Sequence, residues 1–121
     1  MSDIKIKATN TQLTKALENY VDDKVGSLKR FAREQPLNID VELEHMPKHS
    51  SGPVFRCEIM FELPNEKTML RAESVEEDMY AAIDTCVPKI KEQLTKESDR
   101  RETIIKRSGR KLKEMMRGWW E

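Results

Sequence analysis

The sequence contains few of the residues on which catalysis and cofactor binding usually depend. It has only two cysteines, Cys57 and Cys86, and only two histidines, His45 and His49, in 121 residues. The cysteines form no C-x-x-C pair and are too few for a disulfide framework, so we expect both to be core thiols. The histidines span a predicted strand end and a loop, with no cysteine or second acidic ligand at zinc spacing. The sequence therefore predicts no metal, no cofactor and no enzyme activity.

Glycine and long apolar runs are also scarce. The four glycines form no phosphate-cradling loop. No apolar run approaches the length that spans a bilayer, and the N-terminal MSDIKIKATN lacks the apolar segment of a signal peptide. With so little cysteine, these features predict a cytoplasmic domain that has neither a membrane partner nor a small-molecule substrate.

The chain has no net charge, but the two signs are unevenly distributed. Residues 88–121 hold 11 Lys and Arg against 6 Asp and Glu, whereas residues 1–87 hold 11 against 16. Such asymmetry indicates a polyanion-binding region near the C-terminal end. A solvated, charged helix face would give the same composition, so composition alone does not decide between the two.

Hydrophobic periodicity predicts an α+β fold of order β-α-β-β-β-α. Helical spacing predicts a helix over 15–32 with Thr14 as its N-cap. One polar face on each strand favours an antiparallel four-stranded sheet with two helices covering one face. Alternating apolar and polar residues place the strands at 3–8, 37–45, 54–63 and 68–73.

A second helix follows the last strand. Ser74 and Glu77 have the spacing of a capping box that would open it. Pro88 predicts a kink. A break is expected at Ser108-Gly109, and Arg110–Arg117 are compatible with a short amphipathic helix. The stripe predicted to face the core consists of Met79, Ile83, Cys86, Ile90 and Leu94.

Basic residues on the second helix are the candidates for binding. A row of cations along a rigid helix can follow a phosphate backbone, with counterion release supplying affinity. Glu92 and Glu97 interrupt the row, which is also typical of a solvated face. Phe55 and Phe61 are predicted to point inward, which argues against base stacking and favours backbone recognition. The row consists of Lys89, Gln93, Lys96 and Arg100, with Lys91 beside it.

Residues 77–96, EDMYAAIDTCVPKIKEQLTK, resemble the signature helix of the short-form ribosome hibernation-promoting factor family, which includes the ribosome-associated inhibitor A proteins. The first strand and helix, and the turn LPNE, also fit that family, so the resemblance covers roughly residues 3–100. It implies a fold like the double-stranded-RNA-binding domain and binding to 16S rRNA of the small (30S) ribosomal subunit. It further implies that the bound protein blocks the mRNA and tRNA channel and inhibits translation under stress.

The resemblance also assigns roles to individual positions. Ser27 and Glu92 depart from it, because a Lys and an Arg are common there, and Lys91, Arg100 and Arg101 are candidates to replace the lost cations. The positions that match RNA-facing residues are Lys24, Lys89, Gln93 and Lys96. Asp78 and Tyr80 match the motif that positions the second helix.

Residues 1–100 are thus predicted to be the ribosome-binding domain, and 101–121 a basic tail. The tail has three open interpretations besides disorder: an arm along RNA, a site for a protein partner, or an amphipathic segment on an anionic membrane. Two rival functions remain, a general structured-RNA binder and a protein-interaction module that acts through the tail. The apolar residues of the tail are Leu112, Met115, Met116, Trp119 and Trp120.

Overall fold

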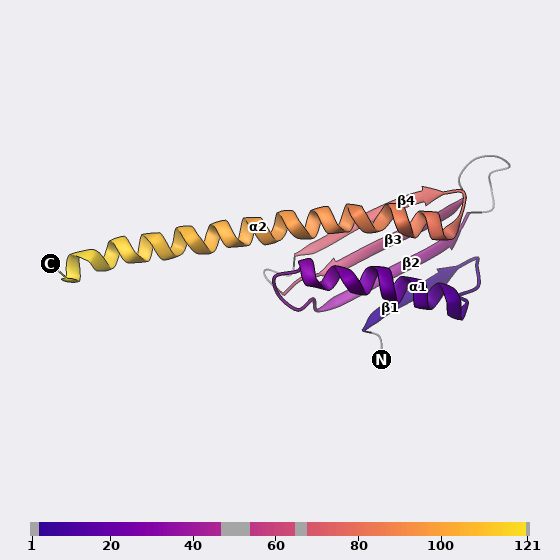
Figure 1. Ribbon diagram of the computed structural model, residues 1–121, viewed down its shortest axis with the longest axis horizontal. Coiled ribbons are helices and arrows are strands. Elements are labelled where there is room, and N and C mark those ends of the chain that lie inside the picture. The colour runs from indigo at the N-terminus through magenta and orange to yellow at the C-terminus, as the bar shows by residue number, and fades with distance from the viewer. Residues whose placement is uncertain (1–2, 47–53, 65–67, 121) are drawn as a thin grey trace.

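The computed structural model describes residues 3–46, 54–64 and 68–120, with side chains described through residue 111 and at 113. Two helices cover one face of a four-stranded sheet (Figure 1), as the α+β prediction required. Along the chain the elements are β1 (Ile4–Thr9), α1 (Lys15–Gly26), η1 (Ser27–Phe31), β2 (Asn38–His45), β3 (Phe55–Glu62), β4 (Met69–Glu76) and α2 (Met79–Trp120).

The strands lie in the order β1-β2-β3-β4, so β1 and β4 form the two edges. The prediction of an antiparallel sheet holds for the β2–β3 and β3–β4 pairs. It is wrong for β1 and β2, which are parallel and pair Ile4 with Ile39. Parallel neighbours need a crossover, and α1 with η1 supplies it by carrying the chain back across the sheet.

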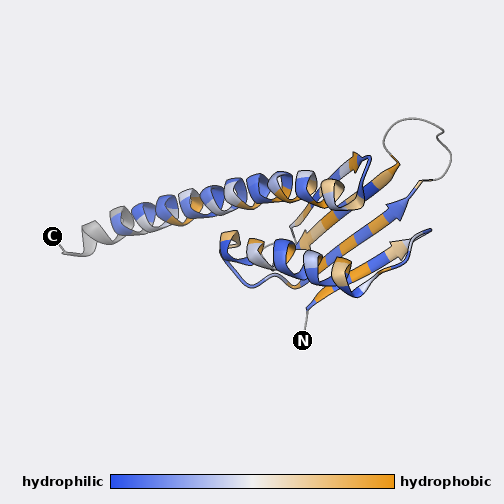
Figure 2. Cartoon of the chain, turned by 45° about the vertical axis from the view of Figure 1, so that its right-hand side comes forward, coloured by the Kyte–Doolittle hydropathy of each residue, from blue (hydrophilic) through white to orange (hydrophobic). Residues whose placement is uncertain are grey.

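The core lies between the sheet and the helices. Every second residue of β2 and β3 is buried, and the residues between them are half-buried on the open face of the sheet. Figure 2 shows hydrophobic and hydrophilic residues alternating along these strands. The α2 stripe Met79, Ile83, Cys86, Ile90 and Leu94 is buried as predicted. Both cysteines are fully buried, and contact with the Cys86 thiol together with burial raises the pKa of the Cys57 thiol. The prediction that they pack in the core is confirmed.

The first helix begins as predicted and ends early. The Thr14 Oγ1 accepts a hydrogen bond from the Leu17 amide at 3.1 Å, which confirms the N-cap. The predicted single helix over 15–32 is divided into α1 and the 3-10 turn η1. Ser27 marks the junction, because its hydroxyl donates to the Lys24 carbonyl at 2.8 Å.

The predicted capping box at Ser74 and Glu77 is wrong. Ser74 lies inside β4, 4% exposed and opposite Cys57 in the register. The strand continues to Glu76 because β3 offers partners that far. The helix therefore starts at Met79, and the Asp78 carboxylate caps it by accepting a hydrogen bond from the Ala81 amide at 3.2 Å.

The second helix is one continuous element of 42 residues. It passes through Pro88, and its C-terminal part projects beyond the sheet (Figure 1). The expected break at Ser108-Gly109 is therefore wrong: a glycine inside a helix costs only about 1 kcal/mol, and neighbouring Lys and Arg favour helix. In the part of the chain that the structure describes, no helix is both long and apolar enough to span a membrane.

Candidate nucleic-acid interface

The cations of α2 lie on two opposite flanks of the helix. Lys89 and Lys91 are two residues apart, which is about 200° around an α-helix. The Lys91 ammonium lies 4.8 Å from the ring centroid of Phe31, on the side of α1 and η1. The Lys89 ammonium instead donates to the Glu73 carbonyl of β4 at 2.8 Å. The structure therefore separates Lys91 from the row beside which the sequence placed it.

Cations and aromatic rings meet in the seam between α1, η1 and α2. The Lys24 ammonium lies 5.5 Å from the Tyr20 ring centroid, and the Arg30 guanidinium lies 4.9 Å from that of Phe31. Rings hold such cations by cation–π attraction while leaving N–H groups for another ligand. Lys24, Arg30 and Lys91 are all exposed. The sequence reasoning missed Arg30, although its position next to Phe31 was a usable signal.

The start of α2 is fixed to α1 by a polar and aromatic contact. The Tyr80 ring packs edge-on against Tyr20, with centroids 4.9 Å apart. The Tyr20 hydroxyl donates a hydrogen bond to the Asp84 carboxylate. Asp78 caps the start of α2, and Tyr80 packs against α1, so both residues lie where the two helices are joined. Tyr20 and Asp84 also form this contact and were not among the expected site residues.

The hydrogen bond to Asp84 raises the pKa of Tyr20 to about 12. The neutral phenol donates to the carboxylate, and its ionisation would place two negative charges side by side. We expect Asp84→Ala to return the Tyr20 pKa toward its ordinary value near 10. Ultraviolet titration of tyrosine ionisation measures this, and a Tyr80→Phe background isolates Tyr20. An unchanged midpoint in Asp84→Ala would contradict the contact.

Side chains of α2 also cover the outer edge of β4. The Gln93 amide donates to the Arg71 carbonyl at 2.8 Å and accepts from the Arg71 amide at 3.2 Å. Lys89 bonds Glu73, two residues further along the same edge. Unpaired backbone N–H and C=O groups on an edge strand can pair with a strand of another chain. The contacts of Gln93 and Lys89 supply hydrogen-bond partners for such groups of Arg71 and Glu73. Gln93 is half-buried, and its carboxamide is directed into the fold rather than toward a ligand.

Ion pairs within α2 hold the other predicted cations. Lys96 pairs with Glu92 at 2.9 Å. Arg100 pairs with Glu97 at 2.7 Å, and this contact lowers the pKa of Glu97. Arg101 is half-buried. The Lys96–Glu92 pair is exposed on both sides and contributes little stability, so a phosphate can replace the Glu92 carboxylate at small cost, whereas the Glu97 side chain is only 14% exposed.

The two residues that were expected to depart from the family pattern make local contacts. Ser27 closes α1 through its bond to the Lys24 carbonyl. Glu92 partly neutralises Lys96. Ser27 and Glu92 therefore both make a contact within the chain.

The open face of the sheet has the opposite character. The Arg56 guanidinium is surrounded by the carboxylates of Glu42, Glu44, Glu58 and Glu73. By strand alternation, this face carries six carboxylates and four cations. A face with excess carboxylates repels a phosphate backbone, which leaves the helix side as the candidate interface. The cations of the open face are Lys5, Lys7, Arg56 and Arg71.

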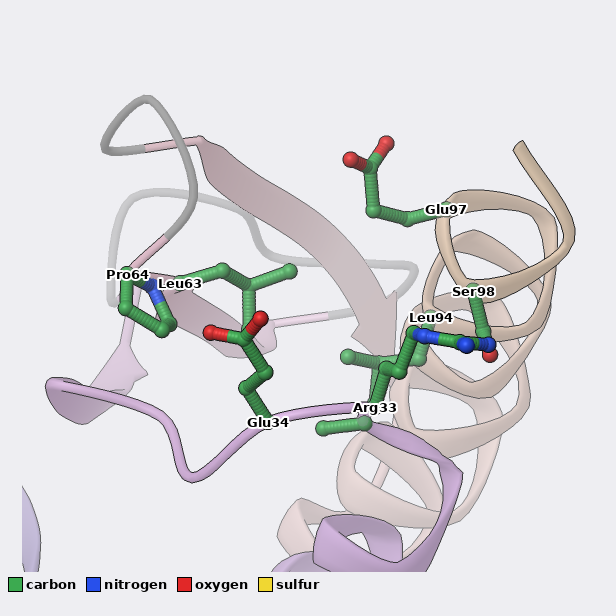
Figure 3. Close-up of a pocket in the computed structure, with 8 residues that line it drawn as sticks. Arg33, Glu34, Leu63, Pro64, Leu94, Glu97 and Ser98 are labelled. Atoms are coloured by element: carbon green, nitrogen blue, oxygen red, sulfur yellow. The ribbon is translucent and has the colours of Figure 1, made fainter. Parts of the chain in front are cut away.

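The pocket at the end of the sheet does not suit a small-molecule substrate. The pocket in Figure 3 lies where α2 leaves the sheet, lined by Arg33, Glu34, Leu63, Pro64 and Ser98 among others. Its volume of about 10 Å³ has room for roughly one water, far less than a usual ligand site. Among the described residues, no three His, Cys, Asp or Glu side chains form a metal-binding group. His45 stacks on Phe55, and His49 lies outside the described residues.

Comparison with known proteins places this geometry in a family context. The family model described as Sigma 54 modulation protein / S30EA ribosomal protein matches residues 4–102. A "Ribosome hibernation promotion factor" of Lactococcus lactis subsp. cremoris (strain MG1363) is 29% identical over 101 residues, which cover 79% of this chain and 49% of that protein. A protein of the same name from Staphylococcus aureus (strain COL) is 31% identical over 93 residues, with 76% and 46% covered. The chain thus spans about half the length of these relatives.

A solved structure shows the same fold. The crystal structure of the Thermus thermophilus Protein Y N-terminal domain matches with a TM-score of 0.65 and 28% identity. The match covers 78% of this chain and 98% of that one. The sequence and fold comparisons agree, and the family model covers well over half of the residues. The chain belongs to the Sigma 54 modulation protein / S30EA ribosomal protein family, which includes the ribosome hibernation promotion factors.

Proposed function

We propose that this chain is a ribosome hibernation factor, a binding protein and not an enzyme. In this proposal it binds the small ribosomal subunit through 16S rRNA, in the channel used by mRNA and tRNA. Occupancy of that channel then blocks both ligands and keeps idle ribosomes inactive under stress. The names of its relatives support hibernation, and the charge distribution supports an RNA partner.

The contrast between the two faces of the domain carries this proposal. On the helix side Lys and Arg outnumber Asp and Glu by eight to seven over α1, η1 and α2 up to Arg100, whereas on the open face of the sheet carboxylates outnumber cations by six to four. Contacts of Lys and Arg with phosphates supply much of the affinity of RNA-binding proteins and set their orientation. Seam cations held on Tyr20 and Phe31 are already oriented before binding, which lowers the entropic cost.

Two variants with equal charge changes test the proposal. The helix-face variant combines Lys24→Gln, Lys89→Gln and Lys96→Gln. The sheet-face control combines Lys5→Gln, Lys7→Gln and Arg71→Gln. We expect the helix-face variant to bind purified small subunits at least about tenfold more weakly, with less dependence on salt, because it loses phosphate contacts. The control should bind like the native chain. Co-sedimentation over a range of salt concentrations measures both.

Two further measurements sharpen the result. Thermal unfolding of both variants checks that loss of the Lys89 bond to Glu73 has not unfolded the domain. A random RNA duplex serves as a competitor. Equal affinity for the duplex and for small subunits would replace the proposal with a general structured-RNA binder. Equal weakening by both variants would reject the helix side as the interface.

A further inference from the structure

The second helix continues far past the domain that it helps to build. Among the described side chains of α2, Leu94 is the last buried one, and Ser98 lines the pocket at the end of the sheet. Residues 102–111 and 113 are exposed, and Figure 1 shows this part of α2 extending away from the sheet. We call residues 101–113 the arm. The family model ends at residue 102, so almost all of the arm lies outside the matched region.

The arm carries one sign of charge. Residues 103–113 include five Lys and Arg and no Asp or Glu. Lys106 pairs with Glu102 at 3.1 Å. Among the described side chains, Arg107, Arg110 and Lys111 have no carboxylate partner. Over the sheet the situation differs, because Lys96 and Arg100 pair with glutamates and Lys89 bonds β4. Lys91 also has no carboxylate partner and contacts the Phe31 ring, so on the described part of α2 most of the cations without a carboxylate partner lie on the arm.

The arm extends the cation row of the domain along one flank of the same helix. Lys96, Arg100, Arg107 and Lys111 follow one another at spacings of 4, 7 and 4 residues, each close to a whole number of helical turns. Their span is about 22 Å, since an α-helix rises about 1.5 Å per residue. A rigid rod with cations at these intervals can contact several phosphates of a folded RNA at once. It needs no rearrangement to do so.

We propose that the arm is a second binding surface for the phosphate backbone of structured RNA, with Arg107, Arg110 and Lys111 as its principal contacts. The identity of that RNA as ribosomal rests on the proposed function; the binding chemistry does not. By sequence the arm holds three large apolar residues, Ile104, Ile105 and Leu112, and of these Ile104 and Ile105 are 38% and 46% exposed. Three such residues beside six Lys and Arg favour a phosphate backbone over an acyl chain or an apolar protein groove.

The test uses the full chain and a matched pair of variants. The arm variant combines Arg107→Gln, Arg110→Gln and Lys111→Gln, and the sheet-face control removes the same charge from the open face. The probes are a helical fragment of small-subunit rRNA, intact small subunits and phosphatidylglycerol vesicles. Gln retains good helix propensity, and circular dichroism checks that α2 persists.

We expect the arm variant to bind the rRNA fragment about tenfold to a hundredfold more weakly, and the slope of log affinity against log salt to fall by about two to three. The sheet-face control should match the native chain. Unchanged affinity in the arm variant, or equal weakening in the control, overturns the inference and leaves the proposed function standing. Arm-dependent binding of vesicles without arm-dependent binding of RNA also overturns it. Arm-dependent binding of the fragment by a chain that does not bind small subunits would support the arm and reject the proposed function.

Discussion

Ile90→Ala is expected to lower the free energy of unfolding by about 2–5 kcal/mol, through lost apolar burial and the cavity that remains. Ile90 is fully buried in the stripe by which α2 packs on the sheet. Its neighbours on the same stripe, Ile83 and Leu94, are equally enclosed, so the backbone has little room to close the cavity. Urea denaturation followed by circular dichroism measures the change.

Ile105→Ala is the matched control. It makes the same substitution on the same helix, at a side chain that is 46% exposed on the arm. The expected change is within about 0.5 kcal/mol, since exposed sites away from packing contacts rarely exceed that. Similar losses of unfolding free energy at Ile90 and Ile105 would mean that the arm contributes to folding as much as the buried part of α2 does. A negligible loss at Ile90 would mean that the helix does not hold the core.

The burial of Ile90 could be predicted from the sequence for a direct physical reason. A stripe at helical spacing must face an apolar partner, and the sheet is the only large apolar face that the predicted strands offer. The same stripe also fixes how α2 is rotated about its axis. With Ile83 and Ile90 toward the sheet, Lys89 and Lys91 must fall on opposite flanks. The position of Lys91 on the flank opposite the row was therefore available from the sequence, although Lys91 was predicted to lie beside the row.

Other features depend on neighbours that local sequence does not specify. Ser74 suits either an N-cap or an inward strand position, and pairing with β3 decides for the strand. The bonds of Gln93 and Lys89 to β4 arise because β4 is an edge strand and α2 lies beside it. The order of the strands determines that β4 is an edge strand and that α2 lies beside it. That order depends on the whole fold and not on local sequence. A residue assigned to RNA by resemblance, such as Gln93, can thus have its polar groups engaged within the chain.

Arg56→Met is expected to destabilise the domain by about 2 kcal/mol at neutral pH, because it removes the central cation of the carboxylate cluster and leaves only Lys7 and Arg71, each 3.8 Å from one carboxylate. The Arg56 guanidinium contacts Glu42 at 2.6 Å, Glu73 at 2.8 Å, Glu58 at 3.0 Å and Glu44 at 3.2 Å. Its side chain is only 16% exposed, so water screens these contacts less than in an ordinary surface pair. Methionine keeps much of the length and apolar volume, so the loss reports mainly on charge.

The destabilisation caused by Arg56→Met should become smaller as the pH falls. Hydrogen bonding to Arg56 lowers the pKa of Glu42 below its ordinary value of 4.5. A carboxylate with a lowered pKa in the folded state stabilises the fold above its unfolded pKa, and this stabilisation is lost as pH falls through the folded value. In Arg56→Met this contribution is absent, and mutual repulsion of the glutamates is relieved as they take up protons. The gap between native and variant stability should therefore narrow below about pH 4.5.

Arg71→Met separates this effect from a general loss of positive charge. Arg71 also lies on the open face, but it is 64% exposed and its closest carboxylate, Glu58, is 3.8 Å away. Its replacement should change stability by no more than about 0.5 kcal/mol, with little dependence on pH. Urea denaturation of the three proteins at neutral and acidic pH compares them directly. A gap for Arg56→Met that stays constant with pH would mean that lost packing, not the four-glutamate cluster, accounts for the destabilisation. A gap that narrows only for Arg56→Met would show that one arginine keeps an otherwise self-repelling sheet face compatible with folding.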